Sequence, residues 1–231
     1  MSKKLLVSNN RSVSVDVPLP TISDGLVCFL DGRNKGNGNV WTDLSGNNNH
    51  AYYSNAKNQR GIIFKDGGMY FQKDGDFGVT VNNAIKGLGK YAVEITFEFT
   101  GEFEAGVLGF DVIGLHLKDE INADIGNVLK YIDFYHANFK KKTTVLMTFN
   151  DEGYFAVYSN GLYELRTFTK EHVNNCNNVI LGCDKTLSED NHIGNYGKAG
   201  LYIYSFKVYN RILTEDEIVK SYEEEQSIVR E

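Results

Sequence analysis

The sequence predicts an all-β protein, an antiparallel sandwich of two sheets, and three observations support this fold class. The chain of 231 residues contains 23 Gly but only 2 Pro, together with 14 Phe and 14 Tyr, a composition typical of many strands joined by Gly, Asn and Asp turns. Strand-like segments recur along most of the chain, separated by turn signals. A helical pattern is convincing in a single segment, close to the C-terminus.

The first half of the chain contains the clearest strand. Residues 91–100, YAVEITFEFT, place Tyr, Val, Ile and Phe at odd-numbered positions and Ala, Glu and Thr at even-numbered positions. This alternation predicts a half-buried antiparallel strand with a polar outer face. Three further segments indicate earlier strands: DGLVCFLDG at 24–32, GIIFKDGG at 61–68 and MYFQ at 69–72.

The second half predicts a three-stranded meander. TTVLMTFN at 143–150 is followed by the turn DEG, and YFAVYS at 154–159 leads into Asn160-Gly161 before LYELRTF at 162–168. Asn-Gly between two apolar runs is the strongest short hairpin signal. Two more strands are expected at 178–183 and 200–210.

The helix and the N-terminal segment differ from the strands. LTEDEIVKSYEEE, from Leu213, has Thr214 as N-cap, Glu217 at the capping-box position and acidic residues in its first turn. At the other end, residues 1–22 contain Pro18 and Pro20, which hold the backbone extended. We therefore expect an N-terminal arm at 1–22 and one domain at 23–231, which includes the helix.

Charge and hydropathy exclude several classes of function. The chain has 24 basic and 30 acidic residues, a net charge of −6, and its basic run is Lys140–Lys142. A nucleic-acid partner is therefore not expected, and no apolar run approaches the length of a membrane span. Cys176 and Cys183 would lie roughly 20 Å apart in an extended strand, so reduced thiols are predicted, with Cys28 in the core.

Several of these segments, in this order, resemble the LamG-type jellyroll of the concanavalin A-like lectin/glucanase superfamily. The resemblance lies in GLVCFLDGRN and WTDLSGNNNHA, then IIFKDGGMYFQ, YAVEITFEF and TTVLMTFNDEGYFAVYSNGLYE, and finally GLYIYSFKVYNRILTEDEI. The resemblance covers residues 24–222. The segments particularly resemble the variants found in bacteriophage structural proteins and bacterial surface proteins. The resemblance implies a two-sheet jellyroll, a scaffold that carries lectins, glycosidases, adhesion modules and structural proteins.

The segment 40–53, VWTDLSGNNNHAYY, allows two interpretations. In the resembling family it is a turn, in which Asp43 and Ser45 bond to nearby backbone amides, Gly46 has a positive φ and Asn47–Asn49 tolerate left-handed geometry. His50 would then lead into a strand. The alternative is a carbohydrate-binding pocket formed by Trp41, Asn49, Tyr52 and Tyr53, because sugars stack on exposed rings beside amide side chains. Tyr70, Tyr131, Tyr135 and Tyr196 are further candidate rings.

Metal and catalytic sites have weaker support. Calcium would require convergent oxygen ligands, and candidates are Asp66, Asp74 and Asp76, with Asp184, Glu189, Asp190 and Asn191 as a second group. Turn-forming acids on a solvated surface explain these residues better than a calcium site does. Glu94 and Glu98 share one strand face, as a glycosidase pair would, but Thr96 replaces the acid that the resembling glycosidases place between them. We therefore predict no enzymatic activity and no cofactor, with calcium as the alternative.

Two functions are consistent with these features. The first is a non-enzymatic virion-associated protein, a head decoration or a tail-associated adhesion component, whose arm docks on neighbouring virion or surface proteins. The second is a lectin that recognises host cell-surface polysaccharide, with or without calcium. The expected location is a virion assembled in the host cytoplasm or the bacterial cell surface, and a homo-oligomer is consistent with either function. Membrane insertion is not expected.

Overall fold

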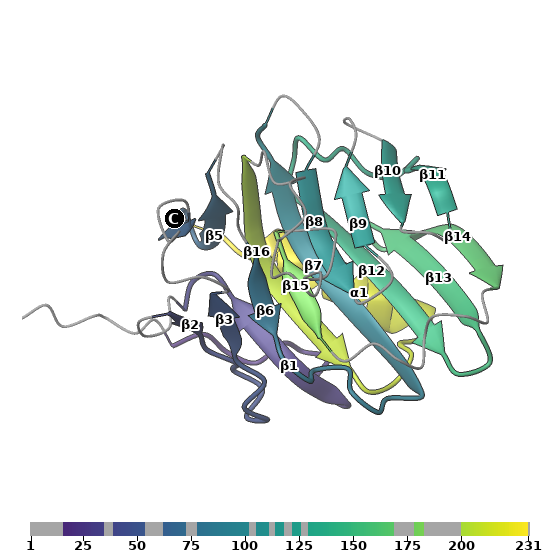
Figure 1. Ribbon diagram of the computed structural model, residues 1–231, viewed down its shortest axis with the longest axis horizontal. Helices are drawn as coiled ribbons and strands as arrows, with labels where there is room; N and C mark the ends of the chain where they lie inside the picture. Colours follow the sequence, from purple (N-terminus) through teal and green to yellow (C-terminus); the bar gives the residue numbers. More distant parts are fainter. Residues whose placement is uncertain are drawn as a thin grey trace, which may run out of the picture.

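The computed structural model describes residues 16–34, 39–53, 62–72, 78–101, 105–110, 114–117, 122–125, 129–168, 178–182 and 200–230. Within these ranges the backbone forms sixteen strands and one helix, α1 (Glu215–Ser227). The strands build two sheets that face each other across a common core (Figure 1). The predicted all-β sandwich with one C-terminal helix is confirmed.

The first sheet contains the strands with the strongest sequence patterns. They are β1 (Leu26–Asp31), β4 (Ile62–Lys65), β5 (Gly68–Phe71), β7 (Lys90–Phe99), β12 (Thr143–Asn150), β13 (Tyr154–Ser159), β14 (Leu162–Phe168) and β16 (Leu201–Tyr209). Their order is β14-β13-β12-β7-β16-β5-β4, and β1 also pairs with β16. The predicted meander is therefore present as β12, β13 and β14.

The second sheet consists of shorter strands, most of which have no clear alternation in the sequence. They are β2 (Val40–Trp41), β3 (Ala51–Tyr53), β6 (Val79–Val81), β8 (Ala105–Phe110), β9 (Gly114–Leu117), β10 (Asn122–Ile125), β11 (Leu129–Asp133) and β15 (Val179–Leu181). Their order is β11-β10-β9-β8-β15-β6-β3-β2. Two of these strands were predicted from the sequence: β15, and β3, which follows His50.

One edge of β16 is shared by two partner strands. Residues 201–203 pair with β5 and residues 205–209 pair with β1, while the opposite edge pairs with β7. The two partner strands meet near Gly32 and Gly68, where a Cβ added to Gly32 would lie 2.5 Å from the Gly68 Cα. Glycine is required there by the close approach of the two backbones.

The first sheet is covered on both of its faces. Its inner face packs against the second sheet and contributes Val93, Ile95 and Phe97 to the main core. A separate cluster on the outer face joins Ala92, Leu146 and Tyr158 to Ile218 of α1, and Figure 1 shows the helix behind this sheet, away from the second sheet. The prediction that strand 91–100 is half-buried was wrong, because α1 covers its outer face and seven consecutive residues, Tyr91–Phe97, are buried.

Helix α1 begins as the sequence predicts. The Thr214 hydroxyl accepts from the Glu217 amide at 3.3 Å, and the Glu217 carboxylate accepts from the Thr214 amide at 2.9 Å. This reciprocal pair satisfies two of the backbone donors that a helix leaves unpaired at its N-terminus.

The end of the predicted arm contacts the domain. Val17 and Ile22 pack against the outer cluster, and the Thr21 amide donates to the Glu224 carboxylate at 3.0 Å. Residues 1–15 lie outside the described part of the chain. Cys28 is buried and free, as predicted, and burial, then the charge of Asp43, raises its thiol pKa. Cys176 and Cys183 also lie outside the described residues.

Candidate functional site

The segment around Asp43 is a structural turn. The Asp43 carboxylate accepts 2.9 Å hydrogen bonds from the backbone amides of Phe29, Ser45 and Asn49, and from the Ser45 hydroxyl. Gly46 has a φ of +87° and Asn48 a φ of +61°. The turn is thereby fixed to β1, which confirms the scaffold interpretation of this segment.

The predicted sugar pocket at this turn is not assembled as expected. Trp41 is 0% exposed, its Nε1 donates to the Asp31 carbonyl at 2.9 Å, and its ring packs edge-on against Phe64. Its faces are therefore closed to a sugar, and placing it in a surface pocket was wrong. The Asn49 amide donates to the Val27 carbonyl at 2.7 Å. Tyr52 is 44% exposed on β3, and the position of the Tyr53 side chain is outside the described part.

The predicted calcium ligands are only partly within the described residues. Asp66 lies in the β4–β5 turn with a φ of +51° and accepts from the Tyr202 hydroxyl at 3.1 Å. Asp74 and Asp76, and the second group Asp184, Glu189, Asp190 and Asn191, fall in segments that the structure leaves undescribed. In the ranges it does describe, no cluster of three or more His, Cys, Asp or Glu is arranged to hold a metal ion.

Glu94 and Glu98 have different environments. Glu94 is 1% exposed and forms an ion pair with Lys207 at 2.7 Å, beneath helix α1. Glu98 is half-buried and accepts from the Tyr204 hydroxyl at 3.0 Å. Thr96, between them, shares a 2.9 Å hydrogen bond with Thr144. The Glu94 carboxylate is therefore enclosed by protein and already neutralised, which is unsuitable for a glycosidase nucleophile or acid.

Glu94 belongs to a buried chain of charges that fixes α1 to the first sheet. Lys207 also pairs with Glu225 of the helix at 3.0 Å, Glu225 pairs with Arg230 at 2.9 Å, and Arg230 reaches Asp31 of β1 at 3.3 Å. Although burial opposes ionisation, the charges of Lys207 and Arg230 lower the pKa of Glu225 to about 2. Burial also opposes the charge of Lys207, but the neighbouring carboxylates of Glu94 and Glu225 outweigh it and raise the pKa of Lys207.

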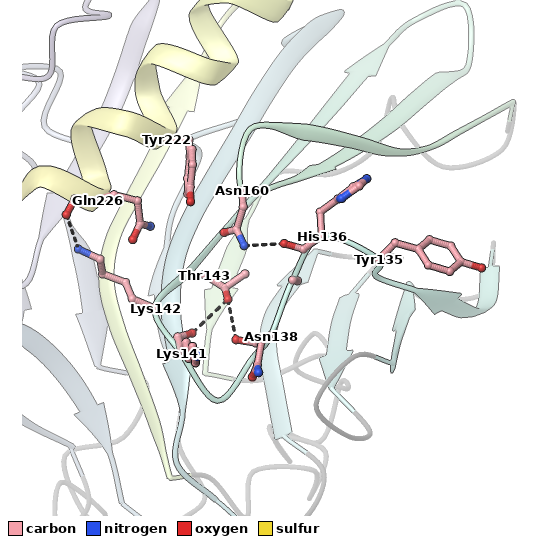
Figure 2. Close-up of a pocket in the computed structure, with 10 residues that line it drawn as sticks. Tyr135, His136, Asn138, Lys141, Lys142, Thr143, Asn160, Tyr222 and Gln226 are labelled. Carbon is pink, nitrogen blue, oxygen red and sulfur yellow. Dashed lines mark hydrogen bonds between the residues drawn. The ribbon is translucent and has the colours of Figure 1, made fainter.

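A pocket of about 540 Å³ opens beside the C-terminal half of α1. Its walls include Asn138, Lys141, Lys142, Asn160, Tyr222 and Gln226, with Tyr135 and His136 at the rim, and we call it the α1 pocket. Figure 2 shows Tyr222 and Gln226 projecting from the helix toward Lys142 and Asn160, while the ring of Tyr135 points outward. Segments distant in the sequence therefore form one site.

Hydrogen bonds hold the walls of the α1 pocket in place. The Asn160 amide nitrogen donates to the His136 carbonyl at 2.7 Å, and its oxygen accepts from the Thr144 amide at 3.1 Å. The Glu164 carboxylate accepts from the backbone amides of Tyr135 and His136 at 3.1 and 2.8 Å. The rim loop is thus tied to the β13–β14 hairpin, which leaves the pocket largely preformed.

Lys142 serves as the C-terminal cap of the helix. Its Nζ donates to the carbonyls of Glu225, Gln226 and Ile228 at 2.8, 3.4 and 3.3 Å. These are carbonyl groups that a helix end leaves unpaired, and a cation is favoured at the negative end of the helix dipole. Burial, followed by the charge of Arg230, lowers the pKa of Lys142.

Other groups in the α1 pocket keep unused hydrogen-bonding capacity. The Gln226 Nε2 is enclosed in the wall and has no acceptor among the described residues. Lys141 is exposed at the opening, and the structure shows no ion pair for it with any described acid. Tyr135 is 81% exposed. The pocket therefore combines prearranged walls with polar groups that could hydrogen-bond to a ligand and an exposed aromatic ring that could pack against it.

Sequence reasoning found only one part of this pocket. Tyr135 was among the candidate rings, whereas Gln226, Lys141 and Asn160 carry no pattern that distinguishes them from ordinary helix, loop and turn residues. The Asn160-Gly161 hairpin was predicted, but its contact with the helix was not. A Cβ added to Gly161, at a φ of +79°, would lie 3.2 Å from the Tyr222 ring, so the turn packs directly against α1.

Comparison with known proteins supports the fold. No model of a protein family matches the sequence, and no curated protein is similar to it. Among solved structures, a Trypanosoma rangeli sialidase matches with a TM-score of 0.66 and 17% identity, over 88% of this chain and 33% of the sialidase. The binding domain of botulinum neurotoxin serotype D/C matches with a TM-score of 0.63 and 15% identity, over 90% of this chain and 54% of that domain.

A further match is the binding domain of botulinum neurotoxin DC in complex with rat synaptotagmin II, with a TM-score of 0.62 and 16% identity over 90% of this chain and 53% of the other. The chain thus spans about a third of the sialidase and about half of the toxin domains. At these identities the likeness shows a shared fold alone. It is consistent with the concanavalin A-like sandwich expected from the sequence.

Proposed function

We propose that the chain is a non-enzymatic, lectin-like binding module that takes a carbohydrate in the α1 pocket. One observation carries the proposal: a preformed pocket of about 540 Å³ places the Tyr222 ring between the side-chain amides of Gln226 and Asn160, with Asn138 also in its lining. Sugars are bound by this combination of aromatic surface and amide groups. The exposed Tyr135 ring adds a stacking surface at the rim for a longer oligosaccharide.

The proposal agrees with the comparisons but does not depend on them. One matched structure, the sialidase, is solved in complex with sialic acid, and one toxin binding domain is solved with a protein receptor. Sialic acid and the protein receptor are ligands of those two proteins. They support a recognition role for this chain only through the shared fold.

The absence of enzymatic activity is part of the proposal. Glu94 is enclosed and paired with Lys207, and the α1 pocket has no carboxylate among its described lining residues. Most glycosidases use two carboxyl groups, one on either side of the scissile bond. Binding without hydrolysis is the activity that this pocket supports.

Assignment to a LamG-type module of a virion stays a prediction from the sequence resemblance. The same holds for docking through the N-terminal arm, for a homo-oligomer and for calcium at Asp66, Asp74 and Asp76. Within the described residues, no helix has the length and apolarity needed to cross a membrane. A glycan-binding module displayed on a particle would combine the two functions expected from the sequence.

A glycan panel with matched variants tests the proposal. The purified chain is screened against oligosaccharides with calcium and with EDTA, and the dissociation constant of the best ligand is measured by calorimetry. Gln226→Leu keeps the side-chain volume but removes the amide, so we expect at least a tenfold loss of affinity. Tyr52→Ala removes an exposed ring of the alternative site and should leave affinity unchanged. Loss of binding in Tyr52→Ala but not in Gln226→Leu, or no saturable binding at all, would contradict the proposal.

A further inference from the structure

We infer that the α1 pocket selects acidic glycans, those that carry carboxylate or sulfate groups. This inference rests on the proposed function and specifies the class of its ligand. The described lining residues include two lysines, Lys141 and Lys142, but no Asp or Glu. The chain as a whole has a net charge of −6, so the pocket is a local departure from its acidic surface.

The two lysines have different roles. Lys142 is committed to the carbonyls at the end of α1, where it offsets the negative end of the helix dipole. Lys141 is exposed at the opening and has no ion-pair partner among the described acids. An anionic group entering the pocket could therefore pair with Lys141. Because Lys142 caps the C-terminus of α1, the negative end of the helix dipole would repel this anion less.

The wall supplies one neutral donor for the same anion, the side-chain amide of Gln226. The Gln226 Nε2 has no acceptor among the described residues, and rotation of the amide about its last side-chain bond exchanges the positions of nitrogen and oxygen. A carboxylate or sulfate oxygen offers the acceptor that this group lacks. Charge-assisted hydrogen bonds of this type are about twice as strong as neutral ones, so an acidic sugar gains more than a neutral sugar of equal size.

Matched pairs of oligosaccharides test this inference. Oligogalacturonate is compared with its methyl ester, and a sulfated oligosaccharide with its desulfated form, by calorimetry with the full chain. We expect the acidic member to bind at least about tenfold more tightly at low salt, and the preference to shrink as salt increases. Lys141→Gln should reduce affinity for the acidic member by about threefold without changing affinity for the neutral member, and Lys86→Gln serves as the exposed control.

The outcomes separate this inference from the proposed function. Equal affinity for both members, with both lost in Gln226→Leu, would overturn the preference for acidic glycans and leave the pocket as a carbohydrate site. Binding of acidic members that is insensitive to Gln226→Leu and Lys141→Gln would place the ligand elsewhere and overturn both. Failure of every acidic member to bind, while neutral glycans bind, would also overturn the inference.

Discussion

Lys207 and Glu94 form a 2.7 Å ion pair in which each side chain is 1% exposed. The two residues face each other across neighbouring strands β16 and β7. Glu225 of α1, which covers this face of the sheet, forms a second ion pair with Lys207. Buried charges are stable only when they are paired and hydrogen-bonded. The pair therefore depends on the helix, and the helix is held over the sheet by the pair.

Removing the central cation should destabilise the fold. In Lys207→Met, Glu94 and Glu225 would remain buried without their shared partner, so we expect the free energy of unfolding to fall by about 3–5 kcal/mol. Urea denaturation followed by circular dichroism measures this change. Lys86→Met, at an exposed turn lysine, should stay within about 0.5 kcal/mol of the parent protein. Equal stability of the two variants would refute a central role for the buried charges.

Acid should destabilise the protein through Glu225. Its pKa is lowered to about 2 in the folded chain, against an ordinary value of 4.5, so the stabilisation is complete above pH 4.5 and is lost as pH falls toward 2. The difference corresponds to about 3 kcal/mol. Glu225→Gln should be less stable than the parent at pH 7 and should lose less stability between pH 5 and pH 2. Parallel curves for the two proteins would argue against this assignment.

The capping box should contribute a modest, local stabilisation. Thr214→Ala removes the hydroxyl that accepts from the Glu217 amide, and we expect a loss of about 1 kcal/mol in the free energy of unfolding. Thr214→Ser keeps the hydroxyl and is the matched control. The prediction fails if the serine and alanine variants have the same melting temperature.

The turn at Asp43 should matter for stability but not for binding. Asp43→Ala leaves three backbone amides without their acceptor, and we expect a loss of about 3 kcal/mol. Glycan affinity, measured below the melting temperature of the variant, should be unchanged. A variant of normal stability that no longer binds glycan would instead restore this turn as the ligand site.

Residues 16–22 of the N-terminal segment should contribute to the stability of the fold. Deletion of residues 1–22 removes Val17 and Ile22 from the outer cluster and the Thr21 contact with Glu224, so that chain should melt below one lacking only residues 1–15. Differential scanning calorimetry of the two truncated proteins measures the difference. Identical melting temperatures would show that residues 16–22 contribute nothing to the fold.

Sequence patterns predicted the parts of the fold that local chemistry determines. The alternation in 91–100, the Asn160-Gly161 hairpin and the Thr214–Glu217 capping box each depend on residues close together in the chain, and each is present. The Asp43 turn belongs to the same class, since its main contacts lie within a few residues or on the adjacent strand β1.

Features that depend on distant contacts were missed. Glu94 and Lys207 are 113 residues apart, and nothing in the strand pattern around Glu94 shows that a helix will cover its polar face. The alternative interpretation of residues 40–53 placed Trp41 in a sugar pocket, yet its ring is buried and its indole nitrogen donates to the Asp31 carbonyl. The α1 pocket combines a loop, a hairpin turn and a helix, so no single stretch of sequence indicates it.

Mapping the ligand by NMR tests the central claim most directly. The isotope-labelled chain is titrated with the tightest-binding glycan, and backbone amide shifts are recorded. The account predicts that the largest shifts cluster at residues 135–143, at Asn160 and at residues 222–226. Shifts centred on Tyr52 and Asn49, with none around the α1 pocket, would contradict it.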